Sequence, residues 1–413
     1  MRLVVIGALA LILGAHDAVA EAARPAAPAR QPGAAGQALR ARFNPPRPGE
    51  TRFVPNEVIL DSNPTVPTPT LETIARRHNM TRLETRVFPL TGRRMHRWRL
   101  DGGGSVEAMI RGLNGERLIA GAQPNYLYSL AQNAPVSVSQ DQYAPLKLNL
   151  AEAHRLSTGN RILIAVIDSG VDASHPELAG AISVNYDAVE DDTQPHPHGT
   201  GMAGAIAARR TLLSVAPRVG LLTVRAFSTK ASTAEGTTFN ILKGLDWAAG
   251  RGARIINMSF AGPNDTRLND ALLKASRKGI VLIAAAGNAG PNSPPLYPAA
   301  DPNVMAVTAT DSEDALFSGA NRGSHIAVAA PGVDVLVPGL NGTYQLSTGT
   351  SVAAAEVSGV AALLIERNPA LTPADIRRIL MRTAKDLGPK GRDPEFGAGL
   401  VNAFQAVRSA RSR

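Results

Sequence analysis

Four residues that could cooperate in acyl transfer lie far apart in the chain, each beside an apolar run. Asp168 closes ILIAVID, and His198 precedes a Gly-Thr-Gly turn. Asn288 follows VLIAAAG, and Ser351 opens an apolar stretch. A serine hydroxyl becomes nucleophilic when an imidazole takes its proton and a carboxylate orients that imidazole. We therefore predict a triad of Asp168, His198 and Ser351, with Asn288 and the Ser351 backbone N–H stabilising the oxyanion.

The order of these residues carries more information than any of them alone. An aspartate after a strand is often a turn former, and a Gly-Thr-Ser sequence is often a helix N-cap. The chain order Asp, His, Ser differs from the orders of chymotrypsin-like enzymes and α/β-hydrolases. For Ser351 we predict two roles at once, helix N-cap and nucleophile.

The region after residue 150 has the sequence pattern of an α/β domain. Short apolar runs predict buried parallel strands, and they lie at 162–167, 219–224, 254–258, 280–286 and 304–309. Helical segments between and after them are expected at 199–210, 237–250 and 267–278, after Ser351 and from Thr372. Strands that alternate with helices predict a doubly wound, mostly parallel sheet whose ligands bind at the carboxyl ends of the strands.

The preceding part of the chain shows a different pattern. Residues 52–131 read as strand, helix, strand, strand, helix, strand, which is the split βαβ order of a small ferredoxin-like α+β domain. Residues 132–150 carry little pattern and are expected to be a connector, so the second domain is expected to span 151–413.

The N-terminus predicts export. Residues 1–20 combine one arginine, a short apolar run and an Ala-Val-Ala site, which are typical of a signal peptide. Residues 21–51 are rich in Pro, Ala and Arg and read as a disordered linker. The apolar run is short for a membrane span, so we expect a secreted or periplasmic protein without a stable membrane anchor after cleavage.

Composition narrows the possible partners. The 413-residue chain has no cysteine, so its stability comes from a core or from bound ions rather than disulfides. Its net charge of +9 is concentrated in residues 1–131, which hold 17 basic and 10 acidic residues. Aromatic residues make up only 4%, and none alternate with the basic ones in a base-stacking pattern, so we expect no nucleic-acid partner.

With these motifs in place, the chain resembles the subtilisin-like serine peptidases, the subtilase family. The resemblance rests on VIDSGVDASHPEL, HGTGMAGAIAA, IINMSFAGP, AAAGNAGP and GTSVAAAEVSGVAALL, in that order. It implies an endopeptidase acting on proteins or peptides, inhibited by its own propeptide at 52–131, whose tail QPNYLYSLAQ would occupy the cleft. It also implies two substrate-pairing edges, formed by Ser259, Phe260 and Ala261 and by Ala285, Ala286 and Gly287.

The chain departs from the family pattern at several positions. Gly201, Val352, Ala355 and Glu356 replace the usual His, Met, Pro and His, and Ala261 replaces a glycine. None of these changes removes a proton-transfer atom. We expect Ala261 to narrow the pocket upstream of the cut. We also expect the Glu356 carboxylate to suit the positive end of the helix dipole and, if it lies near His198, to raise the pKa of that imidazole.

Catalysis of this kind requires no cofactor, and no residues stand out as metal ligands. Two carboxylate groups, Glu190-Asp191-Asp192 and Asp311/Glu313/Asp314, could hold structural Ca²⁺, although neither matches a defined loop. Two other functions stay open on sequence grounds. One is a catalytically silent subtilase fold that binds proteins, prompted by the altered serine helix. The other is a basic nucleic-acid-binding protein.

Overall fold

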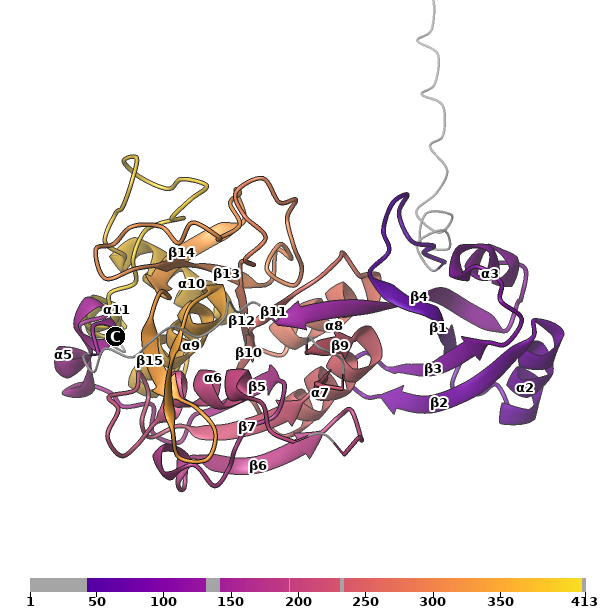
Figure 1. Ribbon diagram of the computed structural model, residues 1–413, viewed down its shortest axis with the longest axis horizontal. Coiled ribbons are helices and arrows are strands. Elements are labelled where there is room, and N and C mark those ends of the chain that lie inside the picture. The colour runs from indigo at the N-terminus through magenta and orange to yellow at the C-terminus, as the bar shows by residue number, and fades with distance from the viewer. Residues whose placement is uncertain (1–42, 131–141, 193, 231–233, 411–413) are drawn as a thin grey trace, which may run out of the picture. The chain divides into compact units, whose positions relative to one another are not determined.

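The computed structural model describes residues 43–130, 142–192, 194–230 and 234–410. The predicted signal peptide and most of the predicted linker lie outside these residues, as does the chain just after Leu130. All described residues belong to one unit, Arg42–Arg413. Within it, Figure 1 shows two large sheets and the helices that cover them.

The first sheet is antiparallel and belongs to the N-terminal region. Its elements are β1 (Phe53–Ser62), α2 (Thr68–Arg77), β2 (Met80–Phe88), β3 (Arg93–Leu100), α3 (Val106–Leu113) and β4 (Ile119–Leu130). The strand order is β2-β3-β1-β4, and all three pairings are antiparallel. This is the predicted ferredoxin-like arrangement. One face of the sheet packs against α2 and α3 through a separate small core that includes Leu60, Leu71, Trp98 and Ile110.

The second sheet is parallel and has the order β14-β13-β12-β10-β5-β7-β6. Its strands are β5 (Leu163–Asp168), β6 (Ile182–Asp187), β7 (Gly220–Arg225), β10 (Ile255–Met258), β12 (Val281–Ala285), β13 (Met305–Thr310) and β14 (Ile326–Pro331). Every neighbouring pair is parallel. The structure therefore confirms the doubly wound α/β fold and adds β6 and β14 to the five predicted strands. ISVNYD alternates apolar and polar residues, whereas IAVAAP is a continuous apolar run that the prediction did not include.

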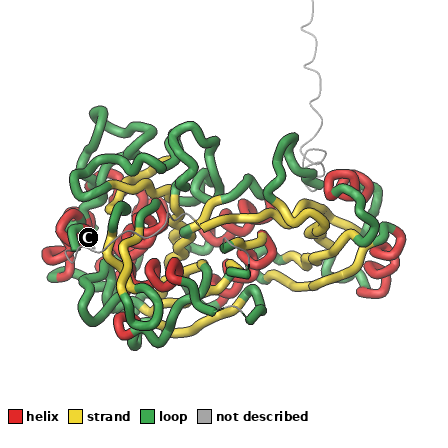
Figure 2. Tube along the Cα trace, in the orientation of Figure 1, coloured by secondary structure: helices red, strands yellow, loops and turns green. Residues whose placement is uncertain are grey.

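Helices cover both faces of the parallel sheet, as the ribbon and tube views show (Figures 1 and 2). Along β5, Ile164 and Val166 point into the core beneath α6 (Pro197–Ala207) and α9 (Thr350–Arg367). Ala165 and Ile167 point into the other core, beneath α7 (Thr238–Gly250) and α8 (Thr266–Arg277). Successive side chains of a strand alternate between its faces, so a strand buried on both sides reads as a continuous apolar run.

Short elements complete the described chain. They are α4 (Ala144–Lys147), α5 (Leu150–His154), η1 (Pro176–Leu178), β8 (Phe227–Ser228), β9 (Glu235–Thr237), β11 (Phe260–Ala261), β15 (Val335–Pro338), β16 (Tyr344–Ser347), α10 (Pro373–Thr383) and α11 (Ala403–Ser409). Strand β4 leaves its own sheet at its carboxyl end and pairs antiparallel with both β9 and β11. It thereby brings the N-terminal domain to the loops around Ser351.

Candidate active site

The predicted carboxylate and imidazole are in direct contact. Asp168 is the last residue of β5, and His198 is the second residue of α6. Nδ1 of His198 lies 2.6 Å from Oδ1 of Asp168, and both side chains are buried. An ionised carboxylate only accepts hydrogen bonds, so Nδ1 donates and Nε2 is left as the basic nitrogen. Among the described residues, Nε2 of His198 has no hydrogen-bond partner.

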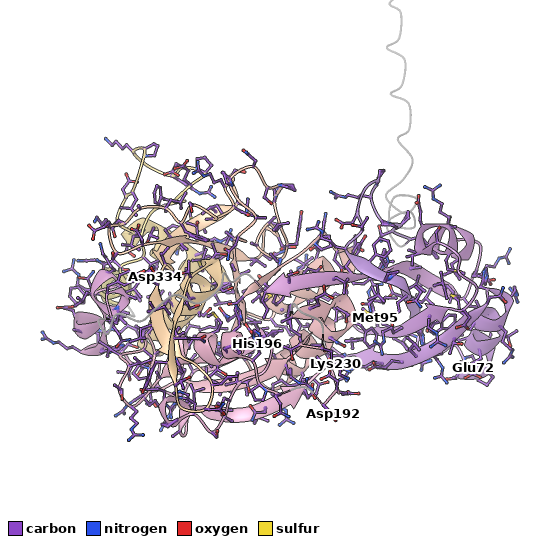
Figure 3. All side chains as sticks on the ribbon, in the orientation of Figure 1. Glu72, Met95, Asp192, His196, Lys230 and Asp334 are labelled. Atoms are coloured by element: carbon purple, nitrogen blue, oxygen red, sulfur yellow. The ribbon has the colours of Figure 1, made fainter. Side chains whose placement is uncertain are left out.

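Two neighbours hold this pair in place. Ser169 donates to Oδ1 of Asp168 from its backbone N–H (2.8 Å) and from its hydroxyl (3.0 Å). His196, labelled in Figure 3, is the N-cap of α6, and its Nδ1 accepts from the backbone N–H of His198 at 3.2 Å. The turn sequence His-Pro-His-Gly therefore starts the helix and orients His198 at its first turn.

Ser351 lies in the first turn of α9 but is not its cap. The N-cap is Gly349, at φ 149°, and no side chain caps the helix, so the predicted capping role of Ser351 is wrong. Its hydroxyl donates to the backbone carbonyl of Ser259 at 3.1 Å. The backbone N–H groups of the first turn have no acceptor within the helix, and that of Thr350 donates to Oδ1 of Asn288 at 3.1 Å.

The side-chain amide of Asn288 is held by Thr350. Its Oδ1 accepts from the backbone N–H of Thr350 (3.1 Å) and from the Thr350 hydroxyl (2.9 Å). These bonds fix the amide plane and leave Nδ2 buried without a partner among the described residues. A buried unpaired donor is costly unless a ligand uses it. Thr350, which the sequence analysis did not single out, is thus the link between Asn288 and the serine helix.

The segment Ser259-Phe260-Ala261 divides between two roles. Ser259 is buried, and its hydroxyl donates to the backbone carbonyl of Ser351 at 3.0 Å and accepts from Asn257 at 2.9 Å. It therefore ties the serine helix to the sheet. Phe260 and Ala261 form β11 and pair with Leu130 and Ser129 of β4. These two residues therefore form an edge that pairs with an extended strand, and their predicted role in binding substrate stays a prediction.

Ala285, Ala286 and Gly287 do not form a second sheet edge, and their predicted role in binding substrate stays a prediction. Strand β12, which ends at Ala285, is an interior strand between β10 and β13. The N–H of Ala286 donates to the carbonyl of Val307 (2.9 Å), and that of Gly287 donates to the Thr350 hydroxyl (3.0 Å). The second edge beside β4 is β9, whose Glu235 pairs with Ser129. The polar sequence of β9 gave no strand signal.

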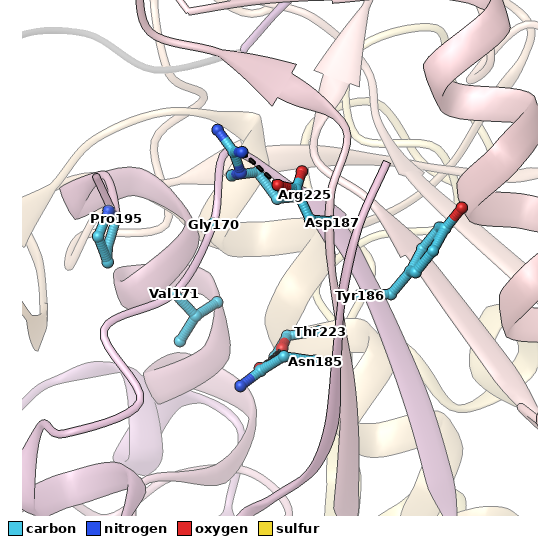
Figure 4. Close-up of a pocket in the computed structure, with 8 residues that line it drawn as sticks. All are labelled: Gly170, Val171, Asn185, Tyr186, Asp187, Pro195, Thr223 and Arg225. Carbon is cyan, nitrogen blue, oxygen red and sulfur yellow. Dashed lines mark hydrogen bonds and ion pairs between the residues drawn. The ribbon is translucent and has the colours of Figure 1, made fainter. Parts of the chain in front are cut away.

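Two hollows lie near these residues. One, of about 460 Å³, lies between β4, β9, β11 and Asn288. Its lining residues include Leu130, Glu235, Ala261, Asn288 and Leu296. The other, of about 330 Å³, lies where β5, β6 and β7 end (Figure 4). There the Arg225 guanidinium pairs with the Asp187 carboxylate.

Comparisons with known proteins agree with this geometry. A family model described as "Subtilase family" matches residues 159–399. The thermophilic serine proteinase of Bacillus sp. (strain AK1) is 36% identical over 314 residues, which are 74% of this chain and 76% of that protein. Thermitase of Thermoactinomyces vulgaris is 36% identical over 278 residues, which are 65% of this chain and 97% of thermitase. The chain belongs to the subtilase family.

It is accordingly a serine-type endopeptidase whose substrates are proteins or peptides. The solved structure of fervidolysin from Fervidobacterium pennivorans shares the fold, with a TM-score of 0.76 and 24% identity over 89% of this chain and 63% of fervidolysin. In the described part of the chain, no helix is long and apolar enough to cross a membrane.

Two departures from the usual subtilase pattern have structural explanations. A Cβ atom at Gly201 would come within 2.9 Å of Val337, so glycine allows the β15–β16 hairpin to pack on α6. Glu356 is buried against a cavity of about 20 Å³, and burial raises its pKa well above the ordinary value. Burial therefore works against the charged form, on which the expected effects on the helix dipole and on His198 depend.

The two acidic groups considered for Ca²⁺ do not fit a calcium site. Glu190 and Asp191 pair with Lys243 and Arg225, respectively. Asp314 lies between Lys147 and Lys385, at 2.8 and 2.7 Å. Asp311 accepts two backbone N–H groups of its own turn. Lysine or arginine thus pairs with Glu190, Asp191 and Asp314, and the described residues contain no cluster of three or more acidic or histidine side chains suited to a metal ion.

Proposed function

We propose that this subtilase cleaves peptide bonds through Asp168, His198 and Ser351. The observation that carries the proposal is the buried 2.6 Å contact between Asp168 and His198, with Nε2 left unpaired among the described residues. The Ser351 oxygen attacks the substrate carbonyl carbon while its proton passes to Nε2 of His198. The Asp168 carboxylate stabilises the imidazolium, and Nδ2 of Asn288 donates to the oxyanion.

The remaining steps return the protons. Collapse of the tetrahedral intermediate breaks the C–N bond, and the leaving amine takes the proton from Nε2. Water then attacks the acyl-enzyme, with His198 again as base, and the serine regains its proton. In the structure the Ser351 hydroxyl donates to the Ser259 carbonyl. In the proposed mechanism this proton passes instead to His198.

We further propose that residues 52–131 are an inhibitory propeptide. Strand β4 lies between β9 and β11, the position that an extended substrate would take. Side chains of this domain also form hydrogen bonds at the N-terminal ends of two helices of the catalytic domain. Asn125 accepts from the backbone N–H of Phe239, in the first turn of α7, at 3.2 Å. Gln123 donates to Asp265, the N-cap of α8, at 2.8 Å. The predicted tail residues after Leu130 lie outside the described residues.

Tyr128 of this strand indicates what the cleft accepts upstream of the cut. Its side chain is fully buried, its ring packs edge-on against Phe260 at 5.8 Å, and its hydroxyl donates to the carbonyl of Pro263 at 3.3 Å. A Cβ at Gly262 would come within 2.3 Å of the ring. The recess thus takes a large aromatic side chain two residues before Leu130.

Export completes the proposal. The N-terminal signal sequence, residues 1–20, directs the chain to the periplasm or the exterior, and the propeptide keeps it inactive until cleavage. One relative, the minor extracellular protease Epr of Bacillus subtilis (strain 168), is 36% identical over 261 residues, 61% of this chain and 40% of its own length. The name of that relative places it outside the cell.

The test is Ser351→Ala in the full chain. We expect peptide hydrolysis to fall by about 10⁶-fold and residues 21 to about 131 to stay attached, as measured by mass spectrometry of the purified protein. A fluorophosphonate probe should label the propeptide-free parent at Ser351 and leave the variant unlabelled. Absence of labelling in folded, propeptide-free parent would instead favour a catalytically silent protein-binding module. Normal maturation of the variant would show that another protease makes the cut.

A further inference from the structure

A hollow of about 750 Å³ lies along helix α10, and none of its residues belongs to the proposed active site. The helix contributes one face with the spacing i, i+3, i+4, i+7, i+8, and the chain after it forms the opposite wall. The lining residues are Ala374, Arg377, Arg378, Met381, Arg382, Ala384, Asp386, Gly391, Arg392 and Ala398. We call this feature the arginine hollow.

Its arginines are largely without acidic partners. Arg377 donates to the backbone carbonyl of Val304, and Arg392 donates to that of Ile326 at 3.0 Å. Within the described part of the chain, neither of them pairs with a carboxylate, and Arg382 makes no ion pair at all. Only Arg378 pairs with an acidic group, Asp375 of the same helix. Carbonyl groups orient the guanidinium groups without neutralising them.

The charges repel one another where they meet. Burial lowers the pKa of Arg377, and the nearby charge of Arg392 lowers it further, against the opposing influence of Asp301. The acidic lining residue, Asp386, accepts the backbone N–H of Gly391 at 2.8 Å. Two cations held close by backbone carbonyls are unfavourable unless an anion approaches them. The hollow is therefore electrostatically prepared for a negatively charged ligand.

We infer that the arginine hollow binds an acidic peptide segment of another protein. From Arg377 to Arg382 the cationic face runs five residues, about 7.5 Å along the helix axis, and Arg392 extends it across the opposite wall. This spread suits several carboxylates along a chain better than a single anionic head. Arginine recognises carboxylates through paired, charge-assisted hydrogen bonds. Between the arginines, Met381 and the alanines offer contact for aliphatic side chains.

The experiment uses the full chain with Ser351→Ala, so that the peptide is not cleaved and β4 still covers the cleft. Fluorescence anisotropy measures binding of a labelled hexapeptide, Asp-Leu-Glu-Asp-Leu-Glu, against its neutral counterpart, Asn-Leu-Gln-Asn-Leu-Gln. We expect binding of the acidic peptide only, weakening as salt is raised. This result does not depend on whether Ser351 is the nucleophile, so the two proposals fail separately.

Variants locate the site. Arg378→Gln combined with Arg382→Gln changes two side chains of the hollow and should weaken binding about tenfold. The control, Arg277→Gln on α8, removes one exposed charge elsewhere and should leave affinity unchanged. Equal binding of the neutral peptide, or full binding by the double variant, would overturn the inference. Complete displacement of the peptide by millimolar inorganic phosphate would also overturn it, because it would indicate a simple anion site.

Discussion

The two large sheets of this protein share the helix pair α7 and α8 but use it differently. The parallel sheet packs against one side of these helices through apolar residues, such as Ile167, Ile256 and Leu282. The antiparallel sheet of residues 53–130 packs against the same pair with Ile59, Phe88 and Met95. Around these, its contacts are charged or polar. The parallel sheet therefore contacts the two helices through apolar side chains, whereas the contact between the antiparallel sheet and these helices also includes ion pairs.

The ion pairs centre on a buried aspartate. Oδ2 of Asp61 accepts from Arg267 of α8 at 3.1 Å and from Arg93 at 2.9 Å, and Asp61 and Arg267 are 2% and 4% exposed. Arg93 also reaches Asp270, at 3.3 Å. Buried ion pairs contribute little net stability, but loss of one partner is strongly destabilising. Such a boundary specifies one docking position and still allows separation, which is what the proposed release of the propeptide requires.

The largest expected effect concerns the chemistry at the end of the parallel sheet. Asn288→Ala removes the oriented Nδ2 donor, so kcat should fall by about 10²- to 10³-fold with little change in KM. Steady-state kinetics on a peptide substrate measure this. Asn269→Ala, in α8, is the control and should keep full activity. An unchanged kcat in Asn288→Ala would remove this residue from the oxyanion hole.

The next prediction concerns the ion pairs between the antiparallel sheet and α8. Asp61→Asn removes the buried carboxylate that Arg93 and Arg267 share and should weaken the inhibition of the proposed mature enzyme by the N-terminal domain by about 3 kcal/mol, roughly 100-fold. Inhibition constants for the separately added domain measure this. Glu72→Gln breaks an exposed pair with Arg82 and should change them little. Equal constants for both variants would mean that the apolar contacts alone hold the domain.

A smaller effect sharpens the view of β4 as a substrate mimic. Gly262→Ala places a methyl group in the recess that holds the Tyr128 ring. Mature enzyme should then cleave peptides with tyrosine at the matching upstream position about tenfold less well, as expected for a loss of about one to two kcal/mol in packing. Peptides with alanine at that position serve as the internal control. An equal loss on both substrates would indicate a general disturbance of the cleft.

The smallest expected effect is on the pH dependence of stability and concerns Glu356, in the core of the parallel-sheet domain. Burial raises the pKa of Glu356 above its ordinary 4.5 in the folded protein. The folded state therefore holds this proton more tightly than the unfolded state. Its stabilising contribution is complete below about pH 4.5 and is lost as the pH rises towards the folded-state value. Glu356→Gln stays neutral, so its free energy of unfolding should fall less above about pH 4.5.

Urea unfolding at several pH values, in the Ser351→Ala background, measures this difference between the Glu356→Gln variant and the parent. Glu152→Gln removes an exposed carboxyl group on α5 and serves as the control. Its profile should run parallel to that of the parent. A Glu356→Gln profile that also runs parallel to the parent at every pH would show that burial does not hold Glu356 in its protonated form.

Much of the fold and of the site follows from local sequence patterns. Apolar runs such as that ending at Asp168 predict buried parallel strands, and the carboxyl ends of such strands meet at one edge. The reactive residues could therefore be named before their contacts were seen. The Asp168–His198 contact agrees with that interpretation. β9 could not be found in this way, because its residues Glu235–Thr237 form a strand only by pairing with β4 and β8.

The sequence alone determined which residues are chemically competent and where the strongly apolar strands and the longer helices lie, because periodicity and residue type act over short distances. Only the tertiary structure decided how those residues are used. It turned the Ser351 hydroxyl to the Ser259 carbonyl, buried Glu356 and so raised its pKa, and gathered the arginines of α10 and its following loop into one hollow. These outcomes depend on which distant segments pack together, and burial and charge at a position are set by that packing.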